Sequence, residues 1–457
     1  MGVTSTAVPD VFDPARYARF RFTGWRFDEP TATVTLGYAL DDEIAFEERI
    51  ALPPGAPPLD PARRAALHAV LELLHQVAGV SYWKAAAPPA LEIGPLTERR
   101  ARLLTDVYVL GLGEYAYRND VDVAGRVRFT GDPAREAEPV RLPRRGRSLV
   151  PVGGGKDSVV ALETMRAAGA DVTLFSVGDA TAIAATAEVA GLPRLVARRE
   201  ISPALLAANA AGALNGHVPV TAVVTLIALA TAVLHGLDEV VLANERSASQ
   251  GNLRWRGIEV NHQWSKGLAF ERALRDLLVH EVTPSVDVFS LLRPASELGI
   301  ARAFAALPAY HRAFTSCNAT FRLDERRRAT TWCGRCPKCR FVFLALAPWM
   351  APDALRDVFG ADLLDDASQT AGFLALCGFE EHKPFECVGE RDESLAAFRL
   401  LAADPRWAGH AVVRAARERM LPAVGPGVGD PEAVLALSDE HEIPARLLPA
   451  VHARLGA

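Results

Sequence analysis

The chain has 457 residues, of which 50% are hydrophobic and 23% are charged, and its formal net charge is −5 at pH 7. This length exceeds one ordinary domain, so we expect two or three domains, and the composition is that of a globular protein with a large core. The absence of a basic excess argues against a nucleic-acid partner. The first residues lack a charged region followed by an apolar one, so we expect no secretory signal and a cytoplasmic location.

Residues 1–145 are predicted to form an α+β domain. Three segments of this part alternate apolar and polar residues between turn signals, as antiparallel strands do. They are 17–27, 32–39 and 43–52. A helix is expected to start after Asp60, because Asp is a good N-cap and Pro61 suits the first helical position. A second helix is expected from about Thr97 through Tyr115, followed by aromatic and polar residues that would form either a ligand pocket or a domain interface.

Residues 148–158 read SLVPVGGGKDS and are the most informative stretch of the chain. The apolar residues predict a buried strand, Gly153, Gly154 and Gly155 a turn without Cβ atoms, and the residues from Lys156 onward a helix. Backbone N–H groups converge at such a turn and the helix dipole adds positive potential, so the pattern indicates a phosphate-binding loop. Its spacing is neither G-x-x-x-x-G-K-[ST] nor G-x-G-x-x-G. The alternative is a glycine-rich turn that binds nothing.

From residue 146 to residue 346 the pattern alternates strands and helices. Strands are expected at 149–152, 172–177, 195–197, 239–243 and 286–291. This alternation predicts an α/β fold with a doubly wound parallel sheet, in which ligands bind at the carboxyl ends of the strands. Polar residues gather at two of these ends: Asp179 follows the second strand, and the segments 244–252 and 259–267 follow the fourth.

Residues 218–237 contain no Asp, Glu, Lys or Arg, and the segment is long enough to cross a bilayer. It is rich in Ala and Thr, however, and leads directly into a predicted strand. A helix packed between a parallel sheet and a neighbouring domain is apolar all round for a different reason, because both of its sides are buried. We therefore predict a buried helix and no membrane partner.

Four cysteines form a spaced cluster: Cys317, Cys333, Cys336 and Cys339. Two successive C-x-x-C steps with a distant fourth thiolate suit a tetrahedral zinc site. A redox or sulfur-transfer pair and metal-free thiols are the alternatives. The chain beyond the cluster, residues 347–457, is predicted to be mostly helical, with a loop at 380–393.

The glycine stretch resembles the PP-loop, S-G-G-x-D-S, of the ATP pyrophosphatases. Gly154, Gly155, Asp157 and Ser158 match that pattern, whereas Gly153 replaces its first Ser and removes one hydroxyl donor. The resemblance implies an α/β fold of PP-loop type that cleaves ATP between its α and β phosphates and leaves AMP on the substrate. The CGRCPKC string resembles the four-cysteine site of the 7-cyano-7-deazaguanine synthases. That likeness implies a structural zinc, because four thiolates leave no open position for water.

A wider resemblance covers nearly the whole chain. The strings FRFTGW, VGGGKDS, HVPVTAV, NERSAS, EVNHQWSK and KPFECVG occur in this order and resemble the UDP-N-acetylmuramoyl-L-alanyl-L-glutamate epimerases. The resemblance implies an ATP- and magnesium-dependent inversion of the terminal L-Glu of UDP-MurNAc-L-Ala-L-Glu to D-Glu, with release of AMP and pyrophosphate, in peptidoglycan precursor synthesis. It implies a small-molecule substrate and no pyridoxal phosphate, and it leaves the oligomeric state undetermined.

These resemblances imply roles for the candidate residues. Pyrophosphate would be bound by the glycine turn and Ser158, with Lys156 near the phosphates and Asp157 holding magnesium. Adenine or ribose would lie near Asp179. The phosphates or the glutamate carboxylates would be held by Glu245, Arg246 and Asn252. Proton transfer would fall to His262, Lys266 and Cys387.

Simpler interpretations stand beside these roles. His262 would then be a hydrogen-bonded structural residue, and Cys387 a small packed residue beside Phe385. The alternative function is that of a PP-loop ligase or nucleotide-modifying enzyme, either amide-forming or similar to 7-cyano-7-deazaguanine synthase. The UDP-sugar end of the substrate would be bound by the N-terminal domain, in which no residue is distinctive.

Overall fold

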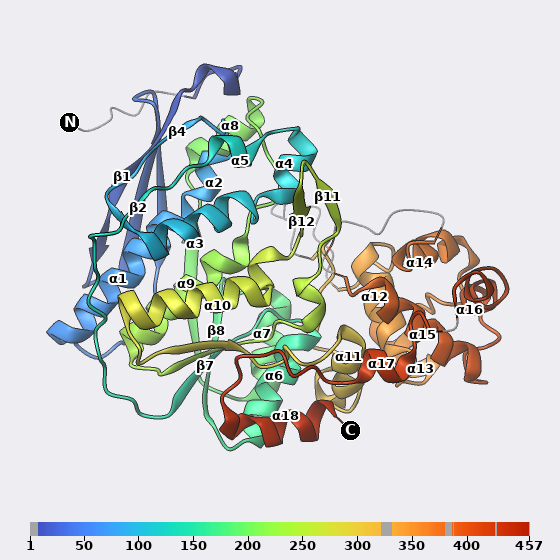
Figure 1. Ribbon diagram of the computed structural model, residues 1–457. Coiled ribbons are helices and arrows are strands. Elements are labelled where there is room, and N and C mark those ends of the chain that lie inside the picture. The colour runs from blue at the N-terminus through green and yellow to red at the C-terminus, as the bar shows by residue number, and fades with distance from the viewer. Residues whose placement is uncertain (1–7, 321–330, 380–385, 387, 426, 457) are drawn as a thin grey trace.

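The computed structural model describes residues 8–320, 331–379, 386, 388–425 and 427–456. Within these residues the fold is α/β and is built on a mixed sheet of nine strands (Figure 1). Their order across the sheet is β13 (Asp287–Ser290), β10 (Glu239–Leu242), β7 (Arg147–Pro151), β8 (Asp171–Val177), β9 (Arg194–Glu200), β3 (Ile44–Ala51), β2 (Thr33–Leu40), β1 (Arg19–Asp28) and β4 (Ala90–Glu92).

The five strands from β13 to β9 run parallel to one another. Numbered along the chain, their order is 3-2-1-4-5 from β9 to β13, which is a doubly wound arrangement. All five predicted strands of this part are therefore confirmed. The order reverses between β7 and β10, so the crevice for a ligand is expected at the carboxyl end of β7.

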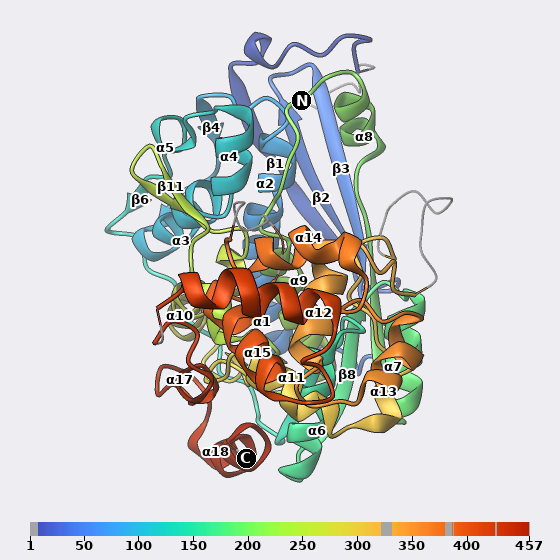
Figure 2. The same ribbon diagram turned by 90° about the vertical axis from the view of Figure 1, so that its right-hand side faces the viewer.

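The strands β1, β2 and β3 extend the same sheet in antiparallel fashion, and β4 pairs parallel with β1 at its edge. The three predicted N-terminal strands are confirmed as β1, β2 and β3, each antiparallel to the next. The sheet becomes continuous where β3 pairs antiparallel with β9, with Arg49 opposite Glu200. In Figure 2 these N-terminal strands stand above the helical C-terminal region.

One face of the sheet is covered by α1 (Pro61–Ala78) and α9 (Val220–His235). The predicted start of α1 is confirmed, because the Asp60 carboxylate accepts a hydrogen bond from the Arg63 backbone at 2.8 Å. The predicted buried helix is α9, which packs against α1 and against β7, β8 and β10. None of the helices in the described part of the chain is both long and apolar enough to span a bilayer.

The second predicted N-terminal helix is wrong in its continuity, because it is split into α3 (Glu98–Val109) and α4 (Gly113–Asn119). Gly111 lies at the break. A Cβ atom added there would be 2.9 Å from the Pro219 ring, at the start of α9, and 2.3 Å from the Val107 carbonyl oxygen. This close approach requires glycine and ends α3.

The opposite face of the sheet is covered by helices that share a hydrophobic core with the C-terminal region. They are α6 (Lys156–Ala167), α7 (Thr181–Ala190), α11 (Glu297–Ala305) and α18 (Leu448–Leu455). The predicted helical region contains α12 (Pro337–Leu346), α13 (Pro352–Phe359), α14 (Thr370–Leu376), α15 (Arg391–Ala403), α16 (Ala411–Ala415) and α17 (Pro431–Leu435). It packs on α11 through α12, α15 and α17, so its side chains share a core with the sheet.

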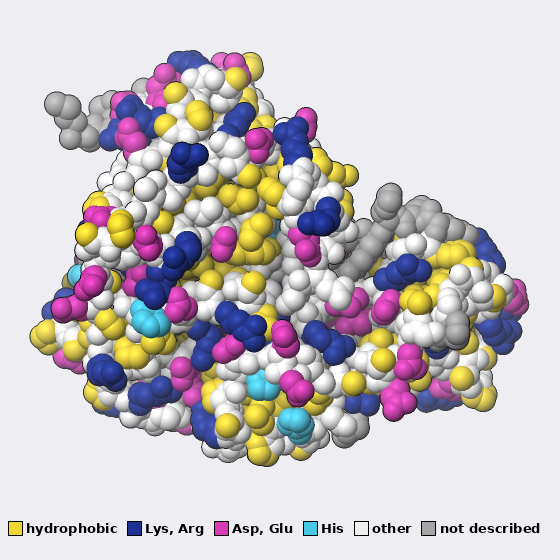
Figure 3. All heavy atoms as spheres, viewed as in Figure 1, with side chains coloured by type: hydrophobic (Ala, Val, Ile, Leu, Met, Phe, Trp, Pro, Cys, Tyr) yellow, Lys and Arg dark blue, Asp and Glu magenta, His cyan; other side chains and the backbone are white. Residues whose placement is uncertain are grey.

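The remaining elements are short, except for α10. They are α2 (Val80–Trp83), β5 (Leu96–Thr97), α5 (Val123–Arg126), β6 (Gly131–Asp132), α8 (Pro203–Ala210), β11 (Leu253–Trp255), β12 (Ile258–Val260) and α10 (Leu268–Leu277). The strands β11 and β12 form a hairpin between β10 and α10 that the sequence pattern did not indicate. On the face shown in Figure 3, acidic and basic side chains are interspersed.

Candidate functional site

The glycine stretch forms a tight turn at the carboxyl end of β7, where the strand order reverses. Gly154 has a φ of +78°, and a Cβ atom there would lie 2.8 Å from the Ala182 backbone, so the turn requires glycine. The helix α6 starts at Lys156, and its N-cap Gly155 contributes no side-chain hydrogen bond. The Thr315 backbone donates to the Gly154 carbonyl at 2.9 Å and holds a second segment against the turn. This geometry suits an anion at the first turn of α6.

Lys156 lies buried among carboxylates at this turn. Its ammonium group contacts both Asp157 and Glu297 and is only 3% exposed. The Glu393 carboxylate accepts the Glu297 backbone N–H at 2.8 Å. Glu245 is 2% exposed, and within the described residues its Oε1 has no hydrogen-bond partner. We call these five residues, Lys156, Asp157, Glu245, Glu297 and Glu393, the acidic cluster.

The acidic cluster holds more negative charge than its single lysine neutralises. Burial alone would lower the pKa of Lys156, but the charges of Asp157 and Glu297 raise it. Burial, with the Asp157 charge adding to it, raises the pKa of Glu297 to about 8, although Lys156 opposes this. Burial also raises the pKa of Glu393 to about 7. Lys156 therefore stays charged, and any proton that is shared near neutral pH resides on a carboxylate. Buried carboxylate oxygens in excess fit a hard divalent cation such as magnesium.

The other predicted site residues lie at the same edge of the sheet, but in different roles. Asp179 follows β8 and forms an ion pair with Arg194 at 2.8 Å. The Arg246 guanidinium donates to two backbone carbonyls at 2.9 Å, those of Val434 and Ala436, and so fastens the C-terminal region. The Asn252 side chain accepts the His262 backbone N–H at 2.9 Å, which fixes the loop after β12.

His262 belongs to a second cluster, which joins three segments far apart in the sequence. Its Nδ1 is hydrogen-bonded to Glu114 of α4. Its ring packs against that of His217, which lies just before α9, with centroids 4.1 Å apart and planes tilted by 37°. Arg118 donates to the other Glu114 oxygen at 2.5 Å. We call Glu114, His217 and His262 the histidine cluster.

Electrostatics assigns different charges within the histidine cluster. Burial and the charge of His262 lower the pKa of His217 to about 4, and Lys266 acts in the same direction. Burial would raise the pKa of Glu114, but the hydrogen bond and charge of His262 lower it overall. At neutral pH the cluster therefore combines an ionised Glu114 with a neutral His217.

Arg293 connects the two clusters. Its guanidinium is 1% exposed and donates to the carbonyl of Glu245 at 2.6 Å and to that of Lys266 at 2.5 Å. One side chain therefore spans the segment that bears Glu245 and the segment that follows His262. Arg293 therefore links the segments that bear the acidic cluster and the histidine cluster.

The sequence pattern missed Glu114, His217, Glu297 and Glu393. His217 stands immediately before the helix α9, a position that would have indicated the carboxyl edge of the sheet. The three glutamates come from helices whose packing the sequence does not reveal. Cys387, which was predicted for proton transfer, lies outside the described residues.

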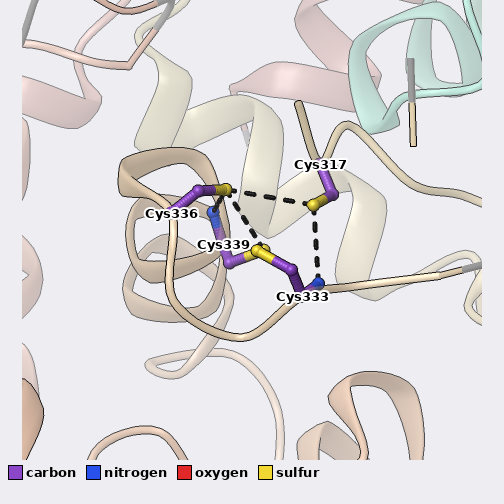
Figure 4. Close-up of side chains that lie close together, drawn as sticks. All are labelled: Cys317, Cys333, Cys336 and Cys339. Atoms are coloured by element: carbon purple, nitrogen blue, oxygen red, sulfur yellow. Dashed lines mark hydrogen bonds between the residues drawn. The ribbon is translucent and has the colours of Figure 1, made fainter. Parts of the chain in front are cut away.

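The four cysteines predicted to bind metal converge (Figure 4). The Sγ–Sγ distances are 3.9 Å for Cys317 and Cys336, 3.7 Å for Cys333 and Cys339, and 3.5 Å for Cys336 and Cys339. Tetrahedral ligands at the usual zinc–sulfur distance of 2.3 Å would be about 3.8 Å apart. The donor set therefore fits a structural zinc ion.

A cavity of about 1120 Å³ lies away from both clusters, none of whose residues line it. It is on the open face of β1–β3 and reaches residues 200–204, which follow β9. Arg21, Arg26, Arg49 and Trp25 are among its lining residues. The strand β9 runs parallel to β7 and lies two strands away. The residues that follow β9 are therefore at the same edge of the sheet as the glycine turn, and the cavity begins there.

Comparisons with known proteins agree over most of the chain. Residues 11–291 match the family described as MurL N-terminal domain, and residues 313–426 match MurL C-terminal domain. A Xanthomonas oryzae pv. oryzae protein is 44% identical over 97% of this chain and 98% of its own length. Relatives from Micromonospora sp. and Salinispora tropica are 50% and 49% identical over 88% of this chain, and over 90% and 88% of their own lengths. All three are named UDP-N-acetyl-alpha-D-muramoyl-L-alanyl-L-glutamate epimerase.

Proposed function

Because the chain belongs to the MurL family of UDP-N-acetylmuramoyl-L-alanyl-L-glutamate epimerases, we propose that it inverts the terminal L-Glu of UDP-MurNAc-L-Ala-L-Glu to D-Glu in an ATP-dependent reaction. The reaction would pass through an acyl-adenylate and release AMP and pyrophosphate. The observation that carries the ATP dependence is the glycine turn at the reversal of strand order, with α6 starting behind it.

Adenylation solves a chemical difficulty of this epimerisation. The Cα proton next to a free carboxylate is very weakly acidic, because its removal places a second negative charge beside the first. Formation of the mixed anhydride with AMP removes the carboxylate charge and makes the Cα–H far more acidic. A positioned base then removes the proton, an acid returns one to the opposite face, and hydrolysis of the acyl-adenylate restores the carboxylate.

The residues would divide this work between the two clusters. The glycine turn, Gly153–Gly155, and Ser158 would bind the departing pyrophosphate, with Lys156 beside it. Asp157 and the unpartnered carboxylate oxygen of Glu245 would hold magnesium, which supplies charge neutralisation on the phosphates. Proton transfer would fall to His262 and Lys266, with Cys387 as a further candidate. The cysteine cluster would hold a structural zinc ion and take no part in the reaction.

We also assign the larger parts of the molecule by this scheme. The sheet from β7 to β13 would be a domain of PP-loop type, within residues 146–346. Residues 1–145 would bind the UDP-sugar end, since the cavity of about 1120 Å³ lies on β1–β3 and carries arginine and aromatic side chains that suit a nucleotide diphosphate. Residues 347–457 would form a helical region that contributes Glu393 to the acidic cluster.

Incubation with ATP, magnesium and UDP-MurNAc-L-Ala-L-Glu in deuterium oxide tests the proposal. The expected products are AMP, pyrophosphate and a D-Glu residue that carries deuterium at Cα. An unchanged α-centre would exclude epimerisation. Pyrophosphate release with ammonia or sulfur joined to the substrate would favour a PP-loop ligase or nucleotide-modifying enzyme instead.

A further inference from the structure

The histidine cluster lies at the edge of the sheet where the glycine turn ends β7. His217 precedes α9, which runs back along β7 and β8 to enter β10, so the start of α9 lies at the carboxyl edge. His262 follows β10 by way of the β11–β12 hairpin. The Asn261 side chain donates to the Ala248 carbonyl at 2.9 Å, which fastens the loop of His262 to the segment that begins with Glu245.

The contacts of His262 are those of an oriented acid–base group. A buried carboxylate that accepts a hydrogen bond from Nδ1 fixes the tautomer and the ring plane and directs proton transfer to Nε2. Glu114 has this position, because it is 5% exposed and is itself held by Arg118. The His217 ring packs against the His262 ring, with centroids 4.1 Å apart.

A divalent metal is the competing occupant, because Glu114, His217 and His262 each offer a ligand atom within 4.8 Å of the others. The surrounding charges disfavour it. The one carboxylate is already paired with Arg118, and the Lys266 ammonium acts on His217 as a further positive charge. A divalent cation at this position would be repelled by Arg118 and Lys266, and the single carboxylate, Glu114, is already neutralised by Arg118.

We infer that Glu114 and His217 are the positioning residues that make His262 the acid–base group of the epimerisation. This inference rests on the proposed function. In the step, the Cα–H bond of the adenylated glutamyl residue breaks, its proton moves to Nε2 of His262, and its electron pair enters the acyl carbonyl of the mixed anhydride to give an enolate. A second group returns a proton to the opposite face of Cα, and the imidazolium then loses its proton to solvent.

Glu114→Gln and His262→Asn test the inference, because adenylation and proton exchange are measured separately. Adenylation is followed by substrate-dependent exchange of labelled pyrophosphate into ATP, and proton transfer by deuterium entry at Cα. His262→Asn is expected to lower deuterium entry at least ~100-fold, and Glu114→Gln about 10-fold to 100-fold, while pyrophosphate exchange changes less than about threefold. Glu114→Asp should recover part of the loss, and Glu114→Gln should shift the pH profile of deuterium entry.

His217→Asn is expected to lower deuterium entry about 10-fold with pyrophosphate exchange unchanged. The exposed pair of Asp276 and His280, 3.1 Å apart, provides matched controls, and Asp276→Asn and His280→Asn should leave both rates unchanged. Equal loss of both rates in Glu114→Gln, or deuterium entry retained in His262→Asn, would overturn the inference. It would also fail if the wild-type protein bound a metal ion that His217→Asn lost. Absence of both rates in the wild-type protein would instead refute the proposed function.

Discussion

At the scale of single residues, charge balance decides what the site is able to bind. Lys156 is one cation among the carboxylates of Asp157, Glu245, Glu297 and Glu393. All three glutamates come from outside the glycine turn. The motif alone shows one lysine and one aspartate side by side, which would neutralise each other. The fold adds further negative charge, and this charge supports the proposal of a cation site beside the glycine turn.

Asp157→Ala is expected to abolish formation of AMP, with a loss of at least ~100-fold, while the fold stays intact. The side chain is partly exposed, and Glu297 still pairs with Lys156 in the variant. AMP and pyrophosphate release measure the activity, and circular dichroism measures the fold. Asp171→Ala is a suitable control, because Asp171 is 68% exposed at the other end of the sheet. Turnover retained in Asp157→Ala would contradict the role of the turn.

His217 is expected to make the protein less stable as the pH falls from about 6.5 to about 4. Burial, with the charge of His262, lowers its pKa to about 4 in the folded state, whereas an unfolded histidine has a pKa near 6.5. Between these values the unfolded chain binds the extra proton, so the free energy of unfolding decreases with falling pH, by on the order of 2 kcal/mol. Urea unfolding between pH 4.5 and pH 7.5 measures this. His217→Asn should flatten the dependence, and an unchanged slope would contradict the burial argument.

At the scale of secondary-structure elements, close backbone approaches place the segments that bear the site. Gly111 allows Pro219 to contact α3, which brings His217 next to Glu114 on the following helix α4. Gly154 allows the turn after β7 to contact the start of α7. The sequence indicated the role of Gly154, because this glycine lies in a recognisable motif. The sequence did not indicate the role of Gly111, since its partner Pro219 lies about a hundred residues away.

The cysteine cluster is expected to stabilise the segment before α12 through bound zinc. Cys336 is the N-cap of this helix, so loss of the metal would release both the loop and the helix start. Metal analysis of the purified protein should find about one zinc ion per chain, and Cys336→Ser should lower the melting temperature by several degrees. Cys377→Ser is the control, because Cys377 is buried outside the cluster. Metal-free wild-type protein that is as stable as the zinc-loaded protein would refute a structural zinc.

At the scale of the whole molecule, the N-terminal strands and the parallel strands form one sheet. Their junction contains a buried ion pair, in which Arg199 of β9 donates to Glu48 of β3 at 2.7 Å. Tyr82 of α2 also donates to Glu48 at 2.7 Å. The pair fixes the register between β3 and β9, and through it the position of the cavity on β1–β3 relative to the glycine turn.

Glu48→Ala is expected to destabilise the protein by about 3 kcal/mol, because it leaves the Arg199 guanidinium buried without its partner. Glu47→Ala is the matched control on the same strand. Glu47 is exposed and lies 3.6 Å from Arg26, so its loss should change the free energy of unfolding by less than about 0.5 kcal/mol. Equal effects of the two substitutions in urea unfolding would show that the buried pair does not hold the junction.

The sequence by itself determined the features that depend on short-range patterns. These are the strands of the sheet other than β4, the capped start of α1, the buried helix α9, the glycine turn and the four cysteines, whose spacing and residue types carry the information locally. Only the tertiary structure decided which distant side chains meet. Glu297 and Glu393 surround Lys156, and Glu114 orients His262, because packing on the sheet brings separate helices together. The charge and pKa of a side chain depend on such neighbours and on burial. The residues adjacent to it in the sequence reveal neither its neighbours nor its burial.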